Sequence, residues 1–332
     1  MKSINLNKLT VIISLFLISV VFSTGANATC KKDADGKLIT ASGNSDTQVI
    51  DVVTGVGERA YDSCTQTPDA YKLTFYKLGL CTADTSFNDL SSCQFVINSA
   101  AGIEHTIIGT ADTPFPIPEF VIDPGTYPYM VVLISAKLAV KHSFQATNAI
   151  DGVTGSGVYC WTSNTGYTGY TSESGTTVTG HGNSTTGGTQ MLECGAAAGT
   201  AVFTHEVINK LNGDTCSATW VANGDRWPVV NEDNEVVTVG NGTAVINLLT
   251  STDGFATSCA NVYKILWTTN LTTPQVVTEN SSFGLSVRTT DAISIDFDSG
   301  VEDEEADPVV ASNNNIIKAG ADPVQLFLTV TD

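Results

Sequence analysis

The chain has 332 residues, of which 34 are acidic and 15 are basic, so its formal net charge is −19. A surface this acidic repels phosphate backbones and anionic lipids, which makes nucleic-acid binding a poor hypothesis. Charged residues make up only 15% of the chain, whereas Gly, Ser, Thr and Asn are abundant. This composition is typical of an extracellular β protein with long polar loops and not of a charged helical enzyme of the cytosol.

Residues 1–28 have the three parts of a secretory signal peptide. Lys2 and Lys8 precede an apolar run over 11–22, and Ala26-Asn27-Ala28 follows as a small-residue cleavage site. A membrane span is the alternative, but the run is shorter than the ~20 residues that a spanning helix needs. The sequence therefore predicts export to the periplasm, the cell surface or the extracellular space, with no membrane span in a mature chain that starts at Thr29. Without the two leader lysines the balance is 34 acidic to 13 basic residues, a net charge of −21.

All eight cysteines lie after the predicted cleavage site, and no Cys-x-x-Cys pair occurs. An even number of cysteines in an exported chain indicates disulfides and not a zinc or redox site. Connectivity does not follow from sequence alone, and pairing between neighbours in the chain is the simplest hypothesis. It gives the pairs Cys30–Cys64, Cys81–Cys93, Cys160–Cys194 and Cys216–Cys259.

Residues 29–68 are expected to form an N-terminal segment with a short edge strand over 48–53. The sequence Asp33-Ala34-Asp35-Gly36 begins like a calcium loop, but the later acidic ligands of such a loop are absent. We therefore interpret 33–36 as an ordinary turn.

Two long strands, 71–80 and 129–136, are predicted to pair and to organise the rest of the chain. Side chains alternate across a strand, so Tyr71, Leu73 and Phe75 share the face that is the core candidate. The alternation puts Leu78 on the opposite face. The second strand follows the turn signal Pro124-Gly125, and its continuous apolar run is typical of a strand buried on both faces.

Further strands are expected on both sides of this pair. Residues 69–211 are predicted to be a Greek-key or meander β-sandwich, and 212–332 a second β module or the completion of that sandwich. The remaining predicted strands are 94–97, 103–109, 118–122, 137–146, 200–208, 218–222, 235–239, 243–249, 260–268, 282–289 and 292–297.

Residues 151–195 contain too few apolar residues to build a core of their own, so a large surface loop closed by Cys160–Cys194 is expected. Within it, Trp161, Tyr167 and Tyr170 are candidates for stacking on a carbohydrate or for contact with another subunit. A solvated β-hairpin extension is the alternative.

The acidic stretch 298–308 is interpreted as a solvated linker. Calcium binding by the carboxylates of 296–307 is the alternative, because hard cations prefer clustered carboxylates. The chain then ends in an alternating strand over 324–331. Such a strand closes its own sheet or is donated to the sheet of a neighbouring molecule, and repeated donation produces a filament.

No catalytic constellation is found in the sequence. The four histidines are isolated from one another, and no Gly-x-Ser-x-Gly elbow or phosphate loop with a following helix occurs. His205-Glu206 begins like a zinc-protease motif, but Asn209 stands where the second histidine must be. The sequence therefore predicts no enzyme and no resident cofactor. Paired carboxylates for glycoside chemistry leave no recognisable spacing, so a glycan-active enzyme remains an alternative.

The segment Tyr71 to Cys81 and the Pro124-Gly125-Thr126-Tyr127 turn that leads into a long strand resemble secreted bacterial β-sandwich surface proteins. These include fibre-forming matrix subunits and pilin-like or adhesin modules, and the resemblance covers 69–146. A chaperone–usher pilin carries its donor strand at the mature N-terminus, whereas the best terminal strand here is at the C-terminus. The resemblance implies a structural or adhesive surface protein, with a filament subunit as one form of it. A secreted carbohydrate-binding module is the alternative.

Overall fold

The computed structural model describes most of the chain, in segments separated by gaps. The described residues are 29–40, 63–85, 88–109, 113–115, 122–152, 154–163, 170–171, 177–178, 190–207, 227–228, 238–239, 241–257, 261–297, 317–321 and 324–331. Within them the chain forms β-strands and turns and no α-helix, which confirms the predicted all-β class. In these segments no helix is long and apolar enough to cross a membrane.

The strands follow one another closely in the chain. Their bounds are β1 (Ser63–Gln66), β2 (Ala70–Cys81), β3 (Cys93–Ile108), β4 (Thr113–Phe115), β5 (Gly125–Ser135), β6 (Lys137–Lys141), β7 (Ser143–Asp151), β8 (Ser156–Thr162), β9 (Tyr170–Thr171), β10 (Thr177–Val178), β11 (Gln190–Gly195), β12 (Thr204–Val207), β13 (Trp227–Pro228), β14 (Thr238–Val239), β15 (Gly242–Leu249), β16 (Lys264–Val277), β17 (Ser282–Arg288), β18 (Ile293–Phe297), β19 (Ile317–Ala321) and β20 (Gln325–Thr331).

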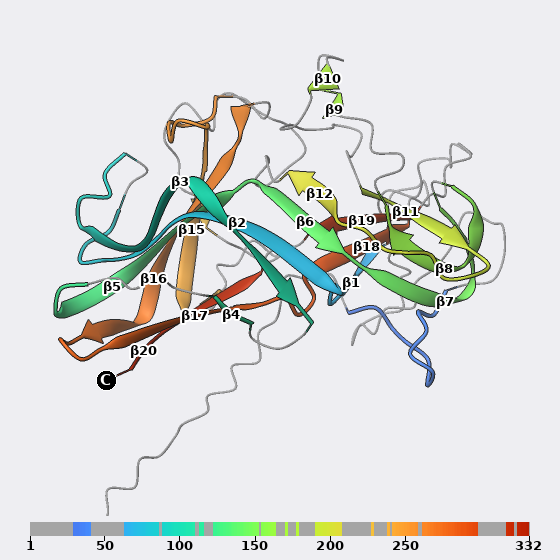
Figure 1. Cartoon of the computed structure of the whole chain (residues 1–332), viewed down its shortest axis with the longest axis horizontal. Coiled ribbons are helices and arrows are strands. Elements are labelled where there is room, and N and C mark those ends of the chain that lie inside the picture. Colours follow the sequence, from blue (N-terminus) through green and yellow to red (C-terminus); the bar gives the residue numbers. More distant parts are fainter. Residues whose placement is uncertain are drawn as a thin grey trace, which may run out of the picture.

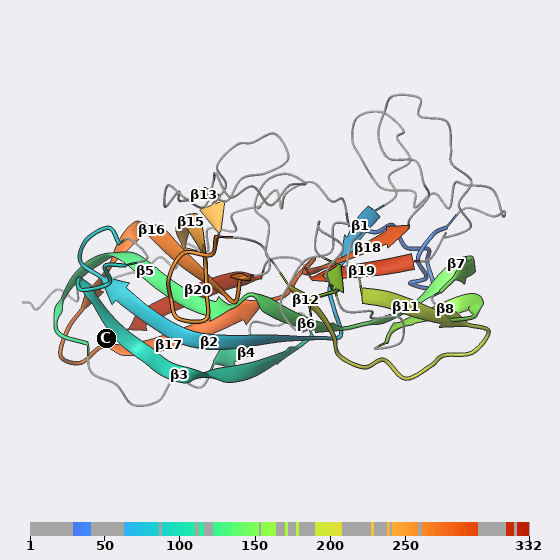
Figure 2. The same ribbon diagram turned by 90° about the horizontal axis from the view of Figure 1, so that it is seen from above.

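Three antiparallel sheets make up the body of the molecule. The largest has the order β12-β6-β2-β5-β16-β15-β13, with β3 beside β2 and β14 beside β15. A six-stranded sheet has the order β1-β18-β19-β11-β8-β7, and a three-stranded sheet has the order β20-β17-β4. The large and three-stranded sheets lie at one end of an elongated molecule and the six-stranded sheet at the other (Figures 1 and 2).

A long bent ribbon of two antiparallel strands joins the two ends. β17 and β18 form one arm, and β19 and β20 form the other. Arg288 is paired with Gln325 in the three-stranded sheet, and Ile293 is paired with Ala321 in the six-stranded sheet. Strands from both predicted modules thus share the same sheets, since β18 and β19 complete the sheet that contains β8 and β11.

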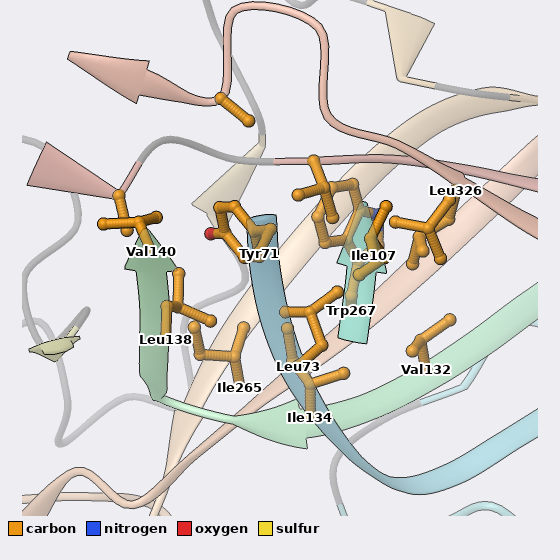
Figure 3. Packing of buried hydrophobic residues seen from close by; sticks show 14 of the residues in the cluster. Tyr71, Leu73, Ile107, Val132, Ile134, Leu138, Val140, Ile265, Trp267 and Leu326 are labelled. Carbon is orange, nitrogen blue, oxygen red and sulfur yellow. The ribbon is translucent and has the colours of Figure 1, made fainter. Parts of the chain in front are cut away.

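The main core lies between the large sheet and the three-stranded sheet. Tyr71, Leu73 and Phe75 of β2 are at most 2% exposed, which confirms the predicted core face. Buried side chains of β3, β5, β6 and β16 gather beside them with Leu326 of β20 (Figure 3). Full burial of an aliphatic or aromatic side chain contributes about 1.5–3 kcal/mol, so this cluster dominates the stability of the fold.

The predicted face of Leu78 is wrong. The pairing of β2 with β5 slips between Phe75 and Lys77, which is the signature of a β-bulge. A bulge inserts one residue and exchanges the two faces beyond it. Leu78 therefore packs in the main core, while Tyr76 packs against a second cluster on the outer face of the sheet. β5 is buried on both faces as predicted, with Val132 in the main core and Val131 in the second cluster.

Residues 94–97 and 103–109 belong to one strand and not to two. β3 runs without a break through residues 98–102, which separate the two predicted strands, and it pairs with β2 across two register shifts. Gly102 has a φ of +79°, and a Cβ there would lie 2.5 Å from Cγ2 of Thr74. Glycine is needed at this point because it tolerates both a positive φ and the close neighbour.

The two ends of the segment 151–195 are paired strands, as the β-hairpin alternative predicts, and not a surface loop. β8 and β11 are paired strands of the six-stranded sheet, with Cys160 directly opposite Cys194. The disulfide between them and the neighbouring strands β7 and β19 supply the stabilisation that the few apolar side chains do not. The short pair β9–β10 is described between them, while 164–169, 172–176 and 179–189 lie outside the described residues.

Three of the four predicted disulfides are present: Cys30–Cys64, Cys81–Cys93 and Cys160–Cys194. The last two join directly opposed residues of adjacent strands, β2 with β3 and β8 with β11. The pair Cys216–Cys259 lies outside the described residues. Buried disulfides form and persist in oxidising compartments, so the fold is compatible with an extracellular or similarly oxidising location.

Several other predictions fall outside the described segments. These are the signal peptide, the strands 48–53 and 218–222, the strand 118–122 except for Ile122, the acidic stretch 298–308 and residue Tyr167. Only the backbone of Tyr170 is described, at the start of β9. The turn at 33–36 is confirmed: Asp33 Oδ1 accepts hydrogen bonds from the backbone N–H groups of Asp35 and Lys37.

Candidate functional site

Trp161 lines a small pocket on the six-stranded sheet. The pocket has a volume of about 120 Å³ and is lined by Ser143, Phe144, Tyr159, Cys160, Trp161, Ala198 and Gly199. β7 and β8 supply most of this lining, because Ser143 is directly opposite Trp161 and Phe144 is directly opposite Cys160 in their ladder. The predicted candidate Trp161 is therefore at a concave site.

The indole of Trp161 is held on two sides. Its Nε1–H donates to Oε2 of Glu193 at 3.1 Å, and Oγ of Ser163 donates to Oε1 of the same carboxylate at 2.7 Å. On the other side, a Cβ on Gly199 would lie 2.2 Å from the ring. Since no side chain fits at 199, the backbone there packs directly on the indole. These contacts fix the ring orientation before any ligand binds.

A polar chain runs from the pocket into the interior between the sheets. Oγ of Ser143 donates to Oδ2 of Asp69 at 2.9 Å, and Nδ1 of His142 lies 3.6 Å from Oδ1 of Asp69. Nε2 of His142 is 3.2 Å from Oε1 of Gln66. His142 is 4% exposed and joins β6 to β7, so this chain links the large sheet to the six-stranded sheet.

Burial raises the pKa of Asp69, but the nearby His142 imidazole and the hydrogen bonds from Ser143 outweigh it, so the pKa is lowered from 3.8. Asp69 is thus an acceptor that holds Ser143 in place. The order of the three groups is serine, carboxylate, histidine. A serine nucleophile needs the histidine beside its hydroxyl and the carboxylate beyond the histidine, so this arrangement does not activate Ser143.

No metal centre is found in the described part of the chain. Among those residues no three His, Cys, Asp or Glu side chains gather as potential ligands. The acidic stretch that was considered for calcium lies almost wholly outside the described segments.

The C-terminal strand β20 is the second candidate surface. It lies at one edge of the three-stranded sheet and pairs with β17 of the same chain, from Ser282 opposite Thr331 to Arg288 opposite Gln325. Leu326 and Leu328 are 3% and 2% exposed and belong to the main core, which confirms the predicted apolar face.

The outer edge of β20 is partly capped. The backbone N–H of Leu328 donates to Oδ1 of Asn241 at 3.0 Å, so this group points away from β17 and is satisfied by a turn of the large sheet. Capping of an exposed edge limits uncontrolled strand pairing. The contacts that hold β20 are thus its buried apolar face, its ladder with β17 and this one edge hydrogen bond.

Sequence reasoning found Trp161 and β20 but missed the residues around Trp161. Ser143, Phe144 and Gly199 reach the pocket through the register of β7 and β8 and through the course of the segment after β11. A tryptophan beside a cysteine was the only local signal. No family model matches the chain, and no curated protein or solved structure matches it.

Proposed function

We propose that this chain is an exported, non-enzymatic protein of the cell surface or extracellular space that associates with copies of itself through its C-terminal strand. The observation that supports this most is β20 itself. It is the last strand that the structure describes and an edge strand of its sheet, and it inserts Leu326 and Leu328 into the main core. A strand with these properties fits the same site on a neighbouring molecule equally well.

Exchange of β20 between copies is a head-to-tail contact. The donating surface and the accepting surface differ, so each molecule can donate to one neighbour and accept from another. Such a contact produces an open filament unless the rotation between copies closes a ring. The opposing residues Leu285 and Val287 of β17 are 1% and 0% exposed, and they would form the floor of the acceptor site.

The test uses the mature chain from Thr29 and a truncated form that ends at Val324. We expect the full-length mature chain to form filaments or oligomers visible by negative-stain electron microscopy, and we expect the truncated form to form none. A peptide of residues 322–332 should bind the truncated form. A full-length chain that stays monomeric at every concentration would overturn the proposal.

Carbohydrate binding at the Trp161 pocket is the second candidate. Aromatic residues beside polar groups are typical of small-ligand sites, and here Trp161, Tyr159 and Phe144 lie beside the hydroxyl of Ser143. Glycan-array binding that is lost in Trp161→Ala and kept in the truncated form would support this function independently of strand exchange.

A further inference from the structure

The outer face of the large sheet, on the side away from the main core, carries a concentration of positive charge. We call this surface the basic face. It is formed by Lys72 of β2, Lys137 and Lys141 of β6, and Phe203 and His205 at β12. Their neighbours along the strands, such as Tyr71, Leu138 and Val140, are buried in the main core, so alternation directs the basic set outward.

Two of these lysines have no acidic partner among the described side chains. Among the side chains that the structure describes, none places a carboxylate within ion-pair distance of Lys137 or Lys141. Lys72 is paired with Glu104 at 2.9 Å, and the Glu104 side chain is 60% exposed. Within the described residues, Lys137 and Lys141 are therefore the lysines of this face that have no carboxylate partner.

The local electrostatics agree with this description. Burial lowers the pKa of His205 from 6.5, and the positive charges of Lys137 and Lys72 lower it further, while Glu104 opposes them. Two cations and one carboxylate thus act on this imidazole, and the cations prevail.

Two lysine side chains already cover the aromatic ring on this face. The Lys72 ammonium lies 4.6 Å from the centroid of Phe203, and that of Lys141 lies 5.7 Å from it. Cations over a ring occupy the surface on which a neutral sugar would stack. The arrangement instead fixes two ammonium groups at a defined separation, which suits carboxylate groups on a partner.

We propose that the basic face binds the acidic run 302–307 of a second copy of this chain. Five of these six residues are Asp or Glu. The inference rests on the proposed self-association and adds the residues that would orient one copy on the next. A chain with a net charge of −21 repels its own copies, so a locally complementary contact is needed to direct association.

The spacing of the lysines on the basic face matches the spacing of the acidic residues in the run 302–307. Lys137 and Lys141 are four residues apart on one strand, which corresponds to about 13 Å. Asp303 and Asp307 are also four residues apart, and in an extended partner they would lie on one side. Lys72 is directly opposite Ala139, midway between the two lysines, so it would meet the middle acidic residue, Glu305.

A second copy is the occupant that the proposed self-association supplies. β18 ends at Phe297 and β19 begins at Ile317, so the acidic run lies between these two strands in the chain. β6 and β12, which carry most of the basic face, contact β19. Binding within one molecule is therefore a distinct outcome, and the test below separates it from binding between copies.

The experiment measures binding of a labelled peptide of residues 298–309 to the mature chain by fluorescence anisotropy. Lys137→Glu with Lys141→Glu is expected to lower the affinity at least about tenfold, because both attractive pairs become repulsive. Lys32→Glu with Lys37→Glu is the matched control, with the same change in net charge outside the basic face, and should bind like the wild type. Raising the salt from about 0.05 M to about 0.5 M should also weaken binding to the wild type.

A charge exchange tests the contact between whole chains. The Lys137→Glu, Lys141→Glu chain should associate with a chain carrying Asp303→Lys and Asp307→Lys better than either associates with itself. Peptide binding that is equal in the wild type and the basic-face variant would overturn the inference. Binding of an anionic polysaccharide without any binding of the peptide would also overturn it. Peptide binding only after deletion of 300–307 would place the acidic run on its own molecule and would also overturn it.

These outcomes are distinguishable from failure of strand exchange. If the truncated form that ends at Val324 fails to assemble and the basic-face variant assembles normally, strand exchange stands and the present inference falls. If the mature chain does not assemble but the peptide binds with the expected dependence on Lys137 and Lys141, the basic face stands and strand exchange falls.

Discussion

The packing of β20 can be tested by shortening one of its buried side chains. Leu328 is 2% exposed and lies opposite Leu285, which is 1% exposed, in the ladder with β17. Leu328→Ala removes buried methyl groups and leaves a cavity between two sheets that pack tightly. We expect this change to lower the free energy of unfolding by about 2–5 kcal/mol.

Thr329→Ala is the matched control. Thr329 is exposed on the opposite face of the same strand, and its hydroxyl donates to the backbone carbonyl of Gly284 at 3.2 Å. Loss of that one surface hydrogen bond should cost no more than about 1 kcal/mol. The two variants therefore differ by several kilocalories per mole only if β20 is packed as the structure places it.

The assay is urea unfolding of the mature chain followed by tryptophan fluorescence, since Trp267 is 5% exposed in the main core. With a slope of about 3 kcal/mol/M, a loss of 3 kcal/mol moves the midpoint by about 1 M. Equal midpoints for Leu328→Ala, Thr329→Ala and the wild type would refute the reasoning, because a side chain that leaves no cavity was not buried.

Three further predictions concern the six-stranded sheet and its junction. Replacing both Cys160 and Cys194 by Ser, which opens a closure with a sequence separation of 34, should lower the stability by about 3–4 kcal/mol in thermal or urea unfolding, and a loss below about 1 kcal/mol would contradict this. Because the folded pKa of Asp69 is lowered from 3.8, this carboxylate contributes stability above pH 4 that is lost as the pH falls further, so Asp69→Asn should flatten the stability profile below pH 4, and an unchanged acid slope would argue against the contact. Gly199→Ala should displace the indole of Trp161 and change its fluorescence maximum, whereas an unchanged spectrum would mean that the ring does not pack on the backbone there.

Alternation and turn signals in the sequence were enough to predict the all-β class, the pairing of β2 with β5 and the apolar face of β20. They failed where the ladder is irregular. The bulge after Phe75 turns Leu78 toward the main core, and no local residue marks it. β19 was missed because Ile317-Lys318-Ala319-Gly320-Ala321 has little strand propensity, and it is held by pairing with β18 and β11.

The candidate site was predictable in part. Trp161 stood out by residue type, and Cys160–Cys194 followed from the order of the cysteines. The residues that contact Trp161 could not be predicted, since strand register and the path of the chain bring Ser143 and Gly199 to it. The basic face was also missed, because its lysines lie on β2 and β6, more than sixty residues apart in the chain.

Strand exchange can be tested most directly by disulfide trapping between two variants that each carry one added cysteine. Oγ of Ser282 and Oγ1 of Thr331 are 2.7 Å apart across β17 and β20, so cysteines at these two positions can form a bond only where β20 lies on β17. Mature Ser282→Cys and mature Thr331→Cys are unfolded, mixed, refolded and oxidised, and the products are separated on a non-reducing gel. The proposed function predicts a covalent heterodimer of the two variants, which requires the strand of one copy to lie on β17 of the other. Absence of that heterodimer, while a chain carrying both substitutions closes a bond within itself, would contradict it.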